Sequence, residues 1–189
     1  LIKNYQLRCN MSEPEYLYTT TRLGLRPLSS QELNGPYPSW FLDAEVNQYN
    51  SHFRLPSSSD AVSAFVSSLK NDKSRLVLAV FWLATHSHVG NISLQQIDHF
   101  NRSAELAFLF GDKALWGQGI AYEAAETLMQ HAQKYLAIRR FTLGCLTVNH
   151  GMIRLAEKLG FTREGTLNQA LWHEGEFRDV ALYGKNATK

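Results

Sequence analysis

The sequence predicts an α/β (α+β) sandwich, in which a central sheet packs against helices. Strand-like segments come first as a meander, and a helix, a strand, a second helix and two more strands follow. The chain of 189 residues is 44% hydrophobic and 19% charged, which is ordinary globular composition and enough to bury a substantial core. The formal charge of +2 comes without clusters of Lys and Arg, so nucleic-acid binding is not indicated.

The first half should hold a strand, two helices and a meander. Residues 19–28 are rich in Thr and Leu and predict the first strand. We expect a short helix over 40–49 with Ser39 as its cap, and a clearer helix capped by Asp60. The apolar stripe of the second helix is Val62, Phe65, Val66 and Leu69. The meander strands are predicted over 76–84, which is apolar on both faces, 88–97 and 103–110.

A glycine-punctuated turn then leads directly into the longest predicted helix. Within 115–136 the apolar residues recur at helical spacing, as Ile120, Ala124, Leu128, Ala132 and Leu136. The first turn of a helix leaves backbone N–H groups without partners and is electropositive, so it suits a phosphate. Gly117 and Gly119 present no side chain, so phosphates can approach the amides closely. The alternative is that these glycines only make a tight connection.

The second half closes the sheet. Residues 140–148 predict a strand, and Asn149 starts a helix that stops at Gly160. The last strands are predicted over 162–167 and 177–183. The pair Glu174-Gly175 between them predicts a hairpin turn.

The glycine turn fits neither common nucleotide motif. A P-loop would need Lys and then Ser or Thr where Ile120 and Ala121 stand, and a dinucleotide fingerprint would need Gly at Tyr122. The turn resembles the acyl-coenzyme A loop of the GNAT acetyltransferases: Gln or Arg, two variable residues, Gly, one variable residue, then Gly or Ala. Residues 116–121 read Trp-Gly-Gln-Gly-Ile-Ala, with Trp116 in place of the leading Gln or Arg. Followed by Glu-Ala, this spelling is similar to the branch of ribosomal-protein N-terminal (alanine/serine) acetyltransferases.

A second signature supports this resemblance. Asn149, followed by Gly160-Phe161, resembles the family's Asn beside the pantetheine arm and its Gly-Phe at the helix end. The resemblance covers about 21–183 and implies the GNAT fold, with a mixed, mostly antiparallel sheet flanked by helices. It also implies acetyl-CoA as co-substrate and direct attack by a primary amine, with no acyl-enzyme. The amine of a protein N-terminus, a polyamine or an amino sugar stays open.

The family also implies where the coenzyme lies. A backbone N–H at the end of the strand before the loop would polarise the thioester carbonyl, and the loop amides would hold the phosphates. The coenzyme-binding candidates are Phe108, Leu109, Phe110, Trp116, Gly117, Gln118, Gly119, Ile120, Ala121 and Asn149.

Glu105 is the candidate base, because it is the only acid in the strand 103–110 and relatives often carry a Glu there that acts through water. Burial in a strand would raise its pKa toward working pH, which suits a base. The alternative is a structural ion pair with Arg102, Arg140 or another cation. Many relatives use a Tyr as the acid, at the position that is Ala156 here.

The acceptor site is expected on the segment after the first strand and on the last hairpin. Trp40, Tyr49 and Trp172 are the candidate substrate-binding residues, and Asp43 and Glu45 could attract a cationic amine. A rival hypothesis is an acyl-CoA-binding sensor or interaction module without turnover, and a weaker one is another phosphorylated ligand.

The remaining expectations concern the chain as a whole. We expect one domain over 11–189, with residues 1–10 as a non-native or upstream extension. Only Cys9 and Cys145 are present and no signal peptide or membrane span is evident, which indicates the cytoplasm and no membrane partner. The sequence His86-Ser87-His88 lacks accompanying ligands, so no metal is expected. A homodimer is an open alternative for the assembly.

Overall fold

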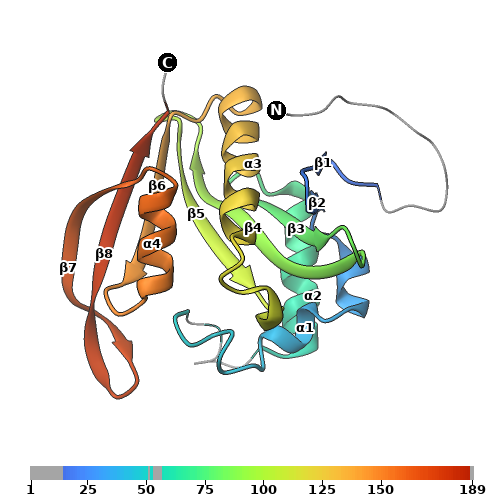
Figure 1. Ribbon diagram of the computed structural model, residues 1–189, viewed down its shortest axis with the longest axis horizontal. Coiled ribbons are helices and arrows are strands. Elements are labelled where there is room, and N and C mark those ends of the chain that lie inside the picture. The colour runs from blue at the N-terminus through green and yellow to red at the C-terminus, as the bar shows by residue number, and fades with distance from the viewer. Residues whose placement is uncertain (1–14, 51, 53–56, 188–189) are drawn as a thin grey trace.

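The computed structural model describes residues 15–50, 52 and 57–187, which contain one eight-stranded sheet (Figure 1). The strand order is β1-β2-β3-β4-β5-β6-β8-β7, in which β5 and β6 pair in parallel and the other neighbours pair antiparallel. The strands are β1 (Tyr18–Thr19), β2 (Leu23–Pro27), β3 (Leu76–Trp82), β4 (Ser87–Asp98), β5 (Ser103–Phe110), β6 (Arg140–Leu146), β7 (Thr162–His173) and β8 (Glu176–Asn186). The predicted mixed, mostly antiparallel sheet is therefore confirmed.

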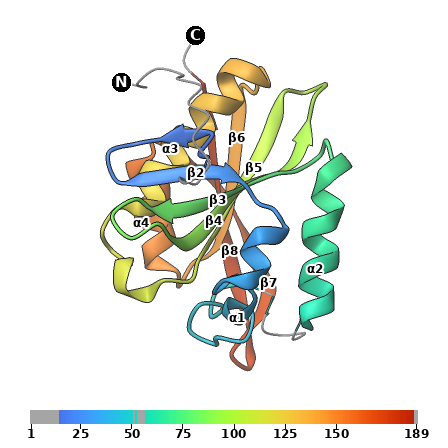
Figure 2. The same ribbon diagram turned by 90° about the vertical axis from the view of Figure 1, so that its right-hand side faces the viewer.

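Helices cover both faces of this sheet. Figure 2 shows α3 and α4 on one side of it and α2 on the other. The α-helices are α1 (Tyr37–Trp40), α2 (Ser59–Ser68), α3 (Ile120–Tyr135) and α4 (His150–Lys158). Short 3-10 helices are η1 (Ser30–Asn34), η2 (Leu69–Asn71) and η3 (Lys113–Leu115). None of the helices in the described part of the chain is long and apolar enough to cross a membrane.

Each face has its own hydrophobic core, because successive side chains of a strand point to opposite faces. On β5, Leu106 and Phe108 belong to the larger cluster, which also contains the buried stripe of α3 and Ala156 of α4. Leu109 packs instead into the cluster formed with α1 and α2. The two clusters hold the sheet between the two helical layers.

The parallel pair at the centre of the sheet is short. Ser103–Glu105 of β5 pair with Arg140–Thr142 of β6, and the pairing ends there, although β5 continues to Phe110 and β6 to Leu146. In Figure 1 the two strands start side by side and then diverge. Backbone groups of the last part of β5 therefore have no β6 strand beside them, which positions them for a ligand.

One predicted helix and one predicted helix cap are wrong. The first helix is α1, which follows Pro36 and ends at Trp40, so the predicted helix over 40–49 is a series of turns. The Ser39 hydroxyl donates to the Pro36 carbonyl at 2.7 Å and caps nothing. In α2 the cap is Ser58 rather than Asp60, because the Ser58 hydroxyl accepts from the Ala61 N–H at 3.2 Å.

The last strands are longer than predicted. β7 runs to His173, because 168–173 extends the pairing with β8 through an irregular register between Leu167 and Leu171. The hairpin turn at Glu174-Gly175 is confirmed, and both residues have positive φ. The prediction for residues 1–10 lies outside the described residues.

Candidate active site

The glycine turn leads directly into α3, whose first backbone amides have no side-chain cap. Gly117 and Gly119 have φ of 75° and 78°, in the left-handed region that glycine adopts at little cost. Gly119 is the N-cap of α3 and offers no side-chain hydrogen bond, so the first-turn amides from Ile120 onward have no side-chain cap. A Cβ at Gly117 would meet nothing within 4 Å, and one at Gly119 only Nη2 of Arg22 at 3.8 Å. The turn therefore leaves open space in front of an electropositive helix end, which fits a phosphate group.

The end of β5 turns alternate amides away from β4. The Gly111 N–H donates to the Val89 carbonyl at 3.1 Å. Since alternate residues of an antiparallel strand bond to the same neighbour, Leu109 also directs its backbone groups toward β4. Phe108 and Phe110 direct theirs toward β6, where the two strands have diverged. Of the three predicted donors for the thioester carbonyl, the register therefore favours Phe108 and Phe110.

Trp116 connects the turn to this strand end. Its indole Nε1–H donates to the Phe110 carbonyl at 3.0 Å, and the side chain is 37% exposed. The position where the family pattern has Gln or Arg is thus filled by a side chain that holds the turn against β5. This contact also confirms that the Phe110 carbonyl faces away from β4.

Glu105 lies at the point where β5 and β6 part, in the last paired position opposite Thr142. It is partly buried, and burial raises the pKa of its carboxyl group. Its Oε2 accepts a hydrogen bond from Nε2 of Gln96 at 3.1 Å.

The two arginines named as alternative partners of Glu105 have other partners. Arg140 forms its ion pair with Glu164, and Nε of Arg102 donates to the Ala137 carbonyl at 2.8 Å. No ion pair to Glu105 occurs among the residues that the structure describes. An uncompensated, partly buried carboxylate of raised pKa suits a general base.

The second helix supplies no hydroxyl at the expected place. Ala156 is fully buried in the core, so that position offers no proton donor. Tyr122 is engaged elsewhere, since its hydroxyl donates to Oε1 of Glu126 at 2.6 Å, and this hydrogen bond raises the Tyr122 pKa. Asn149 caps α4 by accepting from the Met152 N–H at 3.0 Å through Oδ1, so the cap does not use its Nδ2 donors.

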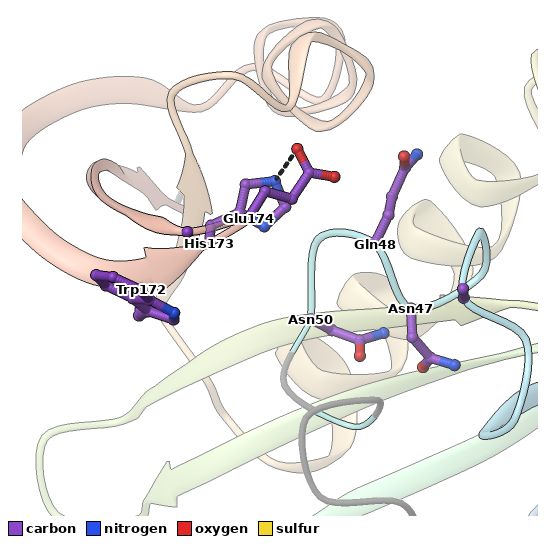
Figure 3. A pocket seen from close by; sticks show the side chains of 8 residues that line it. Asn47, Gln48, Asn50, Trp172, His173 and Glu174 are labelled. Carbon is purple, nitrogen blue, oxygen red and sulfur yellow. Dashed lines mark ion pairs between the residues drawn. The ribbon is translucent and has the colours of Figure 1, made fainter.

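A pocket of about 440 Å³ lies between the turns after α1 and the β7–β8 hairpin. Figure 3 shows residues of the two segments facing each other across it. Its lining residues are Ala44, Asn47, Gln48, Asn50, Trp172, His173, Glu174 and Gly175. Trp172 is 51% exposed, and the rings of Tyr49 and His173 lie 5.8 Å apart. Two of the three predicted acceptor residues thus line this pocket or contact its wall.

The third, Trp40, occupies a different place. It is 5% exposed in the core with α1 and α2, and a Cβ at Gly111 would overlap its indole. Trp40 therefore supports the end of β5 from behind and does not line the pocket.

The acids expected to attract an amine are already paired. Nζ of Lys113 lies 3.0 Å from Asp43 and 2.9 Å from Glu45, and its hydrogen bond holds the Asp43 pKa below its usual value. This pairing ties the pocket's turns to the segment after β5. Of the pocket-lining residues, Glu174 is the acid, and Nε2 of His173 lies 3.7 Å from its Oε2.

Arg22, which no sequence motif singles out, contacts the glycine turn. Its Nη1 donates to the Gln118 carbonyl at 2.9 Å, and Nε and Nη2 lie 2.8 and 2.7 Å from Oε2 of Glu123. The two partners are about a hundred residues from Arg22 in sequence, so no local pattern reveals the contact. Within the described ranges, no group of three or more His, Cys, Asp or Glu side chains could hold a metal ion.

Comparisons with known proteins identify the family of the chain. A family model described as "Acetyltransferase (GNAT) domain" matches residues 22–162. The chain is 33% identical to the ribosomal-protein-serine acetyltransferase of Escherichia coli (strain K12) over 97 residues, and these aligned residues are 51% of this chain. The chain spans about half the length of that relative, at 54%.

Solved structures share the fold. The ribosomal L7/L12 α-N-protein acetyltransferase RimL in complex with coenzyme A superposes with a TM-score of 0.82 at 23% identity, over 91% of this chain and 98% of that chain. The spermidine N-acetyltransferase of Vibrio cholerae in complex with CoA and spermine superposes with a TM-score of 0.80 at 21% identity, over 88% of this chain and 96% of that chain. Because the family model matches well over half of the residues, the chain belongs to the GNAT acetyltransferase family.

Proposed function

We propose that this chain is an acetyl-CoA-dependent N-acetyltransferase that acts on a primary amine by direct transfer. The observation that carries the proposal is the uncapped start of α3, presented by the glycine turn beside the diverging ends of β5 and β6. The turn would hold the phosphates, and the diverging strands would admit the pantetheine arm beside Asn149. Relatives and structural neighbours are named for N-acetylation or hold CoA, which supports the same conclusion.

The residues have distinct roles in the transfer. The amine nitrogen attacks the thioester carbonyl carbon, a C–N bond forms, the C–S bond breaks, and the sulfur leaves as a thiolate that takes up a proton. The amides of Phe108 and Phe110 would stabilise the oxyanion. Glu105 would take the surplus amine proton through water. Since Ala156 offers no acid, the thiolate would be protonated by solvent.

The pocket beside Trp172 is the proposed acceptor site. It lies between the turns that Lys113 ties to the segment after β5 and the last hairpin. Its lining is mostly neutral, with side-chain amides and one indole. A protein N-terminus, a polyamine and an amino sugar remain the acceptor classes to be compared.

The test is titration calorimetry of CoA and acetyl-CoA. We expect wild-type binding of micromolar strength, about 8 kcal/mol. The Gly119→Asp variant should lose it, because the substitution adds bulk and negative charge in front of the uncapped amides. Gly160→Asp is the matched control, since Gly160 also has positive φ, at 80°, but ends α4 beside Lys185.

Turnover follows in an assay of CoA-thiol release with a peptide, spermidine or glucosamine as acceptor. Absence of CoA binding by the folded wild type would reject the proposed function. Binding without thiol release for any amine would favour the sensor hypothesis.

A further inference from the structure

The contacts of Arg22 link three segments around the glycine turn. Arg22 stands directly before β2, and its guanidinium bridges the turn and the first turn of α3. Nη1 donates to the Gln118 carbonyl, while Nε and Nη2 both reach Oε2 of Glu123. The Trp82 ring lies 5.8 Å from the guanidinium carbon and confines it from another side. All donors used point in fixed directions, because the guanidinium is planar.

The Gln118 carbonyl belongs to the same peptide unit as the Gly119 N–H. A peptide unit is planar and trans, so its carbonyl and its N–H point in opposite directions. Once Arg22 holds the carbonyl, the Gly119 N–H must face away from Arg22. The orientation of this amide at the helix start is therefore set by a side chain that stands 96 residues before Gln118 in the sequence.

Glycine makes this control necessary. Gly119 has φ of 78°, but glycine populates negative φ about as readily, so the peptide unit before it could flip at little cost. A flip would turn a carbonyl toward the phosphates in place of an N–H, and a carbonyl repels an anion. The contact with Arg22 opposes such a flip.

Glu123 holds Arg22 in place. Its carboxylate also accepts from the Thr20 hydroxyl and from the Arg22 backbone N–H at 3.3 Å. Burial alone would raise the Glu123 pKa, but the hydrogen bonds from Thr20 and Arg22 outweigh it, so the pKa is lowered and the carboxylate stays ionised. The ion pair also offsets a negative charge that would otherwise stand in the first turn of α3, near the phosphates.

We infer that Arg22 is a positioning residue of the coenzyme site, which locks the Gln118–Gly119 peptide with its N–H toward the phosphates before acetyl-CoA binds. The inference rests on the proposed function for the identity of the ligand. Arg22 acts through the backbone, so it should govern affinity for the coenzyme and leave the chemical step unchanged.

The test compares Arg22→Met with Arg140→Met, which removes an ion pair of the same kind to Glu164 on β6 and β7. By calorimetry, the Kd of CoA should rise about tenfold in Arg22→Met, as expected for losing a hydrogen bond from a charged group, and stay unchanged in Arg140→Met. The KM for acetyl-CoA should rise in parallel, with kcat at saturation within about twofold of wild type. Arg22→Lys should recover part of the affinity, because a lysine supplies the charge without the fork of donors.

Hydrogen exchange without ligand gives an independent measurement. Amides of residues 115–122 should exchange faster in Arg22→Met than in wild type, and not in Arg140→Met. Equal CoA affinity of the two Met variants, or unchanged exchange over 115–122, would overturn the inference. A fall in kcat at saturation equal to the loss in kcat/KM would also overturn it. If wild type itself fails to bind CoA, the proposed function is rejected, and exchange still decides whether Arg22 orders the turn.

Discussion

The indole N–H of Trp116 donates to the carbonyl of Phe110 at 3.0 Å, and this bond joins the glycine turn to the end of β5. It connects the two parts of the proposed coenzyme site, the amides proposed for the phosphates and those proposed for the thioester carbonyl. A change at one part can therefore be transmitted to the other.

Trp116→Phe should weaken CoA binding by about fivefold, because it keeps most of the ring and removes one hydrogen bond worth about 1 kcal/mol. Calorimetry with CoA is the measurement. Trp172→Phe is the control, since Trp172 lies on the β7–β8 hairpin and lines the proposed acceptor pocket, away from the glycine turn. A Trp116→Phe variant with wild-type affinity would mean that the turn keeps its position without this bond.

Glu105→Gln should lower kcat by about a hundredfold or more, which is the usual contribution of a general base, with the Kd of CoA unchanged. The amide preserves shape and can still accept from Gln96. Glu164→Gln is the control, because Glu164 is a surface acid paired with Arg140. The assay is thiol release at saturating acetyl-CoA. A kcat for Glu105→Gln within twofold of wild type would remove Glu105 from the mechanism.

The same variant should be more stable than wild type at neutral pH. Burial raises the folded-state pKa of Glu105 above its unfolded value, so the folded protein prefers the protonated form. Below the unfolded pKa, about 4.3, wild type and Glu105→Gln should have equal stability from this group. As pH rises through the folded pKa, wild type loses stability that the amide retains. Thermal melts at acid and neutral pH check the sign, and a variant less stable at pH 7 contradicts it.

Trp172→Ala should raise the KM for the amine acceptor about tenfold, while the affinity for CoA stays at the wild-type value. The reason is that the indole lines the proposed acceptor pocket, and aromatic side chains supply much of the contact energy at such sites. Leu167→Ala is the control, since Leu167 is exposed on the same strand outside the pocket. Steady-state kinetics with the best acceptor is the measurement. Equal KM values for the two variants would show that the acceptor does not bind in this pocket.

Much of the fold can be predicted from the sequence, because the patterns that indicate strands, helices and caps involve residues close together in the chain. The strand 103–110 has the bounds that the sequence predicts, since its run of mostly apolar residues is a local signal. The helix start at Asn149 was also correct, because an Asn cap leaves a local signature. The prediction of a helix over 40–49 is wrong, because the turns there are stabilised by side-chain hydrogen bonds that the spacing of apolar residues does not reveal. Nδ2 of Asn47 donates to the carbonyls of Trp40 and Asp43, at 2.5 and 2.8 Å.

Sequence motifs indicate the candidate site only where its residues are close together in the chain. The glycine turn and Asn149 carry motifs, whereas the contact of Arg22 with Gln118 spans 96 residues. The pairing of Lys113 with Asp43 likewise depends on the closed sheet. Such contacts appear only once the strands are in register.

Cys145→Ala should leave kcat within about threefold of wild type, because direct transfer needs no acyl-cysteine. Cys145 is 8% exposed on β6, and burial raises the pKa of its thiol, so little of it is in the reactive thiolate form at neutral pH. The measurements are thiol release for the variant and the rate at which iodoacetamide labels Cys145 in the folded wild type, followed by mass spectrometry of its peptide. Labelling should be slow and should leave activity largely intact. Complete loss of turnover in Cys145→Ala, with CoA binding retained, would show that the acetyl group passes through the thiol and would overturn the direct-transfer mechanism.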